Sequence, residues 1–69
     1  MAEVSITFNH RTYRFACREG EEERLRAIAD YVKSKLGALS VEHGPVGDER
    51  LVLMAALMIA DELFDARAD

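Results

Sequence analysis

Residues 51–64 read Leu-Val-Leu-Met-Ala-Ala-Leu-Met-Ile-Ala-Asp-Glu-Leu-Phe, and this stretch carries the strongest structural signal in the chain. Placed on a helix at about 100° per residue, one apolar set covers about 160° of the surface. We expect this set to form a dimer interface: Val52, Leu53, Ala56, Leu57, Ile59, Ala60, Leu63 and Phe64. The opposite side carries a second apolar set: Leu51, Met54, Ala55 and Met58. A helix that is apolar on every side is expected to be buried on every side.

The chain is too short to bury both sides of such a helix by itself. Its 69 residues form one domain, over residues 1–69, and a chain of this size buries only about 60% of the surface that it exposes when unfolded. Cores of this size supply about 3–5 kcal/mol unless disulfides, metals or partner subunits add to them. Cys17 is the only cysteine, which excludes a disulfide within the chain. We therefore expect a homodimer.

The second helix is predicted over residues 48–69. Asp48 is a favourable N-cap residue. Asp61, Glu62 and Asp65 are expected to form a water-facing side after the apolar stretch. The 4-3-4-3 spacing that is typical of a coiled-coil seam recurs at Val52, Ala56, Ile59, Leu63 and Ala66. We expect the helix to be the start of a longer coiled coil, because no stop signal precedes its end.

Residues 3–17 predict a β-hairpin. Polar and apolar residues alternate on both sides of Asn9-His10, which is typical of a two-residue turn. If Phe8 pairs with Arg11, one face carries Val4, Ile6, Phe8, Tyr13, Phe15 and Cys17. The other face then carries Ser5, Thr7, Thr12 and Arg14. This register places Arg11 at the hairpin tip, on the edge of the apolar face.

A first helix is predicted over residues 21–39. Three glutamates follow Gly20, where negative charge favours a helix start. One apolar stripe recurs at helical spacing: Leu25, Ile28, Ala29, Val32, Leu36 and Leu39. Gly37 either caps this helix or lies within it. Residues 40–47 predict a loop, so the expected fold is α+β, with a β-hairpin followed by two helices.

Composition disfavours several functional classes. Nine basic against thirteen acidic residues give a net charge of −4, which disfavours a nucleic-acid binder and a protein held on anionic lipid. The longest apolar run, residues 51–60, is too short to cross a bilayer. A single cysteine and the absence of a signal-peptide pattern at the first residues predict a cytoplasmic protein.

No arrangement of residues predicts an active site. Cys17 continues an apolar strand face and is expected to pack there, without a partner base. His10 and His43 lack metal-ligand spacing. Gly44 and Gly47 match no phosphate-binding loop. We therefore expect no catalysis, no cofactor and no metal.

The whole chain resembles the ZapA family of bacterial cell-division proteins. The hairpin carries the pattern Val4-x-Ile6-x-Phe8-x-x-Arg11-x-Tyr13-x-Phe15-x-Cys17. The strongest likeness is residues 50–63, with an Ala-Ala-Leu core followed by Glu-Leu. Two features depart from the family: His10 occupies a turn position where glycine is usual, and the long coiled coil that joins dimers into tetramers is represented only by its start.

The resemblance implies a non-enzymatic scaffold at the midcell division site. Family members bind the tubulin-like GTPase FtsZ and bundle its filaments in the Z-ring. The implied FtsZ-binding patch lies on the hairpin, where Arg11 matches the family's arginine, and comprises His10, Arg11, Thr12 and Arg14. Other interpretations stay open. The arginines could be ordinary edge-strand cations, the chain could be an unrelated dimeric adaptor or antitoxin-like module, or the hairpin could be a nucleic-acid-binding ribbon with Arg18 as a third cation.

Overall fold

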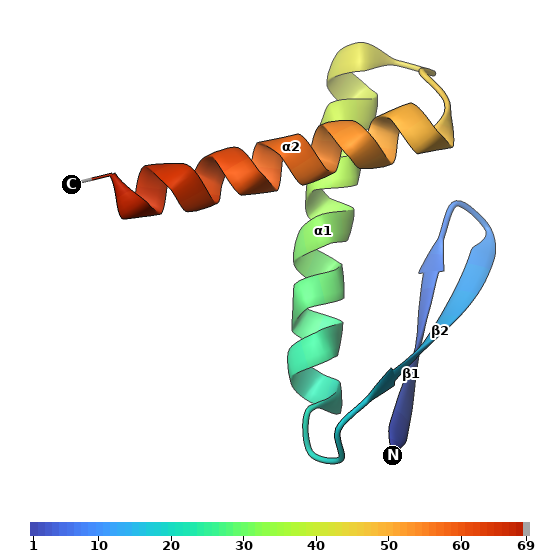
Figure 1. Cartoon of the computed structure of the whole chain (residues 1–69). Helices are drawn as coiled ribbons and strands as arrows, with labels where there is room; N and C mark the ends of the chain where they lie inside the picture. Colours follow the sequence, from blue (N-terminus) through green and yellow to red (C-terminus); the bar gives the residue numbers. More distant parts are fainter. Residues whose placement is uncertain (69) are drawn as a thin grey trace. The chain divides into compact units, whose positions relative to one another are not determined.

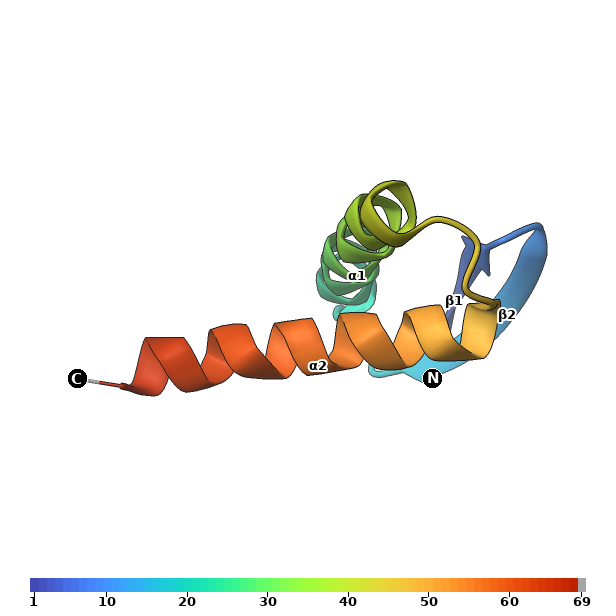
Figure 2. The ribbon, with the colours of Figure 1, turned by 90° about the horizontal axis from the view of Figure 1, so that it is seen from above.

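The computed structural model describes residues 1–68 and has the predicted α+β architecture (Figures 1 and 2). Two strands, β1 (Ala2–Phe8) and β2 (Arg11–Cys17), are followed by helices α1 (Glu22–His43) and α2 (Asp48–Arg67). The second helix was predicted to reach Asp69, which lies outside the described residues.

The hairpin has the predicted register. β1 and β2 pair antiparallel, with Phe8 opposite Arg11, Ile6 opposite Tyr13 and Val4 opposite Phe15. Asn9 and His10 have φ values of 51° and 68°, as a two-residue turn that follows the strand twist requires. Glycine is therefore not needed at this turn, because the backbone of His10 itself adopts the left-handed conformation.

The chain forms two compact units, Met1–Lys33 and Ser34–Asp69. The first contains the hairpin and the N-terminal half of α1, and the second contains the rest of α1, the connecting loop and α2. Gly37 lies within α1 and does not end it. A side chain would fit at this position, since nothing lies within 4 Å of where the Cβ of residue 37 would be.

Helix α1 is longer at its C-terminus than predicted. It continues through Ser40 to His43, so the expected loop over residues 40–47 is reduced to residues 44–47. Gly44 ends the helix with a φ of +71°, and its N–H donates to the Ser40 carbonyl at 2.9 Å. This is the left-handed C-cap arrangement that glycine favours. Pro45 follows one residue later and cannot continue the helix.

The start of α2 differs from the prediction by one residue. Gly47, with a φ of +89°, is the N-cap, and no side chain caps the helix through a hydrogen bond. Asp48 is the first helical residue, where its carboxylate still meets the positive end of the helix dipole.

Four side chains are buried among the described residues: Val4, Leu36, Leu39 and Ala55. Three of them belong to the second unit, where α2 crosses the C-terminal half of α1 (Figures 1 and 2). Ala55 is the buried residue of α2. Ile28 departs from the predicted α1 stripe, because its side chain is exposed.

Candidate functional site

The four residues of the predicted FtsZ-binding patch lie on three different parts of the hairpin. His10 forms the turn, and Arg11 stands opposite Phe8 on the apolar face. Thr12 and Arg14 lie on the other face, opposite Thr7 and Ser5. All four are exposed. The structure therefore presents them around the hairpin tip and does not gather them on one face.

The polar face of the hairpin is fully exposed. The hydroxyl oxygens of Thr7 and Thr12 lie 3.1 Å apart and share a hydrogen bond across the strands. Ser5 and Arg14 form the neighbouring cross-strand pair. Pairs of this kind stabilise a two-stranded sheet by tenths of a kcal/mol to about 1 kcal/mol each. The face is thus ordered, hydrophilic and available to a partner protein.

The apolar face of the hairpin is covered unevenly. On β1, Val4 is 1% exposed, whereas on β2 Tyr13 and Phe15 are 43% and 47% exposed. Cys17, which was predicted to be a buried packing residue, is only partly buried. The apolar side of β2 is therefore a second exposed surface, which alternation alone could not distinguish from the covered side of β1.

Helix α2 has a covered side and an uncovered side. The wholly or partly buried positions recur at helical spacing: Leu51, Met54, Ala55, Met58, Ile59 and Glu62. The remaining apolar positions up to residue 64 are exposed: Val52, Leu53, Ala56, Leu57, Ala60, Leu63 and Phe64. The uncovered side therefore matches the predicted interface set except for Ile59, which is partly covered within the single chain. At about 100° per residue, it spans about 140°.

Glu62 does not belong to the predicted water-facing side. Its carboxylate oxygen Oε2 lies 2.5 Å from Nζ of Lys35 on α1, and both side chains are partly buried. This ion pair joins the two helices of the second unit. Twenty-seven residues separate the partners, so the pattern within either helix could not reveal it.

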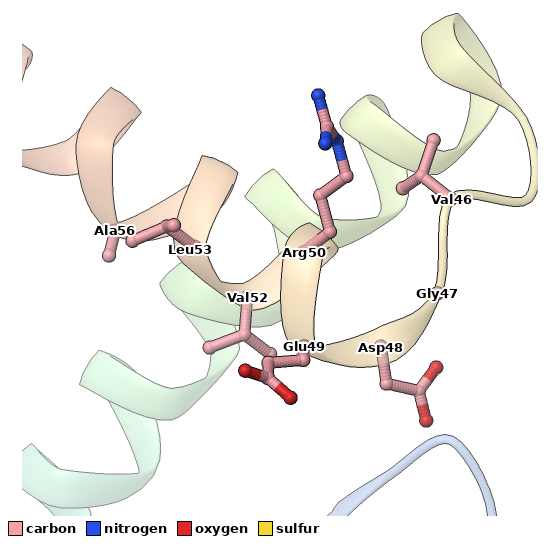
Figure 3. Close-up of a pocket in the computed structure, with 8 residues that line it drawn as sticks. All are labelled: Val46, Gly47, Asp48, Glu49, Arg50, Val52, Leu53 and Ala56. Atoms are coloured by element: carbon pink, nitrogen blue, oxygen red, sulfur yellow. The ribbon is translucent and has the colours of Figure 1, made fainter.

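A shallow groove of about 770 Å³ opens at the first turns of α2 (Figure 3). Its apolar lining comes from Val46 on the loop and from Val52, Leu53 and Ala56 on the helix, which are part of the uncovered side. Gly47, Asp48, Glu49 and Arg50 complete the lining. The groove extends the uncovered side of α2 to the loop before it.

Residues 1–68 contain no group of three or more histidine, cysteine or acidic side chains placed to hold a metal ion. No helix in the same range is long and apolar enough to span a membrane. The candidate site is therefore a set of surfaces: the hairpin tip with its polar face, the apolar side of β2, and the uncovered side of α2.

The model of the family described as "Cell division protein ZapA" matches residues 4–69 and so takes in all four elements. This chain belongs to the ZapA family. It is thus a cell-division protein, as its sequence pattern predicted, and the match takes in the hairpin and both helices described above.

A curated relative was found in Rickettsia prowazekii (strain Madrid E), an uncharacterised protein that is 25% identical over 60 residues. The alignment covers 87% of this chain and 57% of the relative, so the chain spans little more than half of that protein's length. No solved structure matches the chain.

Proposed function

We propose that this chain is a non-enzymatic, homodimeric scaffold that binds FtsZ filaments and promotes their bundling and Z-ring assembly in the cytoplasm at midcell. The observation that carries the proposal is the uncovered apolar side of α2 in a chain of the ZapA family. An exposed apolar surface of this extent is typical of a protein interface.

Exposed apolar side chains support self-association. Leu53, Leu57 and Phe64 on the uncovered side of α2 are 60%, 63% and 70% exposed. Burying them against a second copy would remove this apolar surface from water, which is the main favourable contribution to most protein association.

Filament binding is assigned to the hairpin tip and its polar face. His10, Arg11, Thr12 and Arg14 are exposed and carry two positive charges in an otherwise acidic protein. A two-fold dimer presents this patch twice, on two equivalent surfaces. Two patches on one particle are what cross-linking of neighbouring filaments requires.

The experiment is co-sedimentation with GTP-polymerised FtsZ, with light scattering recorded in parallel. The test variant is Arg14→Glu on the polar face of β2, and the matched control is Lys33→Glu at an exposed position of α1. Reversing a charge at an interface rim costs about 1–2 kcal/mol, so we expect roughly tenfold or greater weakening for Arg14→Glu alone. GDP-bound, unpolymerised FtsZ provides the baseline.

Binding with increased scattering would support the full proposal. Binding without an increase in light scattering would show that the chain binds filaments but does not bundle them. No binding by the wild type would refute the FtsZ assignment and leave an interaction module for another partner. An equal loss of FtsZ co-sedimentation in both variants would indicate a general charge effect and would contradict the assignment of the hairpin to the interface.

A further inference from the structure

The uncovered side of α2 is wider than one helix–helix seam. The predicted seam, which contains Val52, Ala56 and Leu63, spans about 80° at 100° per residue. Leu53, Leu57 and Phe64, here called the outer row, lie about 60–100° beyond it and are 60%, 63% and 70% exposed. A dimer joined only through the seam would leave these three large side chains in water.

The apolar side of β2 is also partly exposed. Tyr13 and Phe15, here called the strand row, point to the same side of the sheet as the buried Val4, yet nearly half of each remains exposed. An uncovered pair of aromatic side chains on a two-stranded sheet is a strong candidate for a buried contact, because aromatic residues dominate interface energetics.

The two rows match in spacing. Alternate residues of a strand lie about 6.8 Å apart, and residues four apart on a helix lie about 6 Å apart along its axis. Tyr13 and Phe15 can therefore stand over Leu53 and Leu57 at the same time. Cys17 continues the strand row, so it would fall near Glu49 in one direction of docking and near Asp61 in the other.

Charge favours the strand row over a second outer row as the occupant. Asp61 flanks the outer row at an exposed position, and α2 carries five carboxylates against two arginines. Two outer rows paired in parallel would bring like charges together, because Asp61 and Arg50 both flank the row. Strand β2 carries no acidic residue, and Arg11 lies at the end of its apolar side. Complementary charge guides such an encounter.

We infer that the strand row of a second copy of this chain covers the outer row of α2, so that each hairpin docks on the partner's helix. This inference rests on the self-association proposed above and adds which surfaces meet. It makes the hairpin part of the dimer on its apolar side while its polar face stays free for a filament.

The test uses Cys17, the only cysteine of the chain, as one end of a cross-link. Wild-type chains are mixed with chains that carry Cys17→Ser and a new cysteine from either Glu49→Cys or Asp61→Cys, and a short bismaleimide is added. The matched control carries Cys17→Ser with Val41→Cys, since Val41 is 89% exposed and reacts on any random collision. Circular dichroism checks that every variant is folded.

We expect a cross-link between wild-type and variant chains with the cysteine at 49 or at 61. It should form roughly a hundredfold faster than with the control, because docking raises the effective thiol concentration from micromolar to millimolar. Either position would support the inference and identify the docking direction. Two results would overturn it: rates equal to the control, or cross-links between variant chains only.

Sedimentation of the same samples tests self-association separately from the docking of the hairpin on the partner's helix. A dimer without the mixed cross-link would refute the docking of hairpin on helix and leave the proposed scaffold function intact. A monomer at every concentration would refute self-association itself.

Discussion

Replacing Leu57 by glutamine separates the stability of the single chain from that of the dimer. Leu57 lies on the uncovered side of α2 and is 63% exposed, so glutamine should change the folding free energy of one chain by less than about 0.5 kcal/mol. In the dimer the same side chain would be buried. The variant therefore should stay helical and lose association.

The size of the loss follows from the exposed fraction. Fully burying a leucine is worth about 1.5–3 kcal/mol, so the remaining 63% corresponds to about 1–2 kcal/mol per copy. Both copies carry the change in a symmetric dimer. The free energy of dimer dissociation should therefore fall by about 2–4 kcal/mol. The dissociation constant should rise roughly 30-fold to several hundred-fold.

Sedimentation velocity over a concentration series measures this constant, and far-UV circular dichroism follows the fold. Val41→Gln is the matched control, because it replaces another exposed aliphatic side chain that lies outside the interface set. An unchanged dissociation constant for Leu57→Gln would show that α2 associates through another side or not at all. An equal effect of Val41→Gln would show that the loss is nonspecific.

Three further changes test the fold. Leu39→Ala, at a position 4% exposed, should cost about 2–5 kcal/mol in urea unfolding, and a smaller loss would place Leu39 outside the core. Gly37→Ala in mid-helix should raise the melting temperature, because it removes a helix penalty of about 1 kcal/mol. Gly44→Ala should lower the melting temperature, because φ is +71° at this position. A change of melting temperature in the same direction for both variants would contradict the assigned end of α1. Lys35→Met should lower the free energy of unfolding by less than about 1 kcal/mol, and by less still in high salt, because the ion pair with Glu62 is partly exposed. A loss of stability that does not depend on salt would show that Lys35 contributes through packing instead.

The features that local patterns determine could be predicted from the sequence. Alternation around a two-residue turn specified the register of the hairpin. The all-round apolar pattern predicted two apolar sides on α2, of which the single chain covers one. The end of α1 was placed too early because Ser40 and Val41 carry no clear helix signal, and the left-handed conformation of Gly44 is what ends the helix.

The remaining features depend on contacts between elements. Periodicity could not say which side of α2 the chain covers by itself, so Ile59, which the chain partly covers, was placed in the predicted dimer interface. Glu62 was expected to face water because its neighbours in sequence are acidic, but its partner Lys35 lies on the other helix. Tyr13 and Phe15 share a face with Val4, and only the structure distinguishes the exposed side of that face from the covered one.

The small core has a consequence for how long each molecule survives in a cell. Only four described side chains are buried, so in the proposed dimer a newly made subunit would draw much of its folding free energy from association, and its melting temperature would rise with protein concentration. Subunits without a partner would unfold more often and be open to proteases. Turnover would then keep the pool of unpaired chains small, and cellular abundance would be tied to dimer formation.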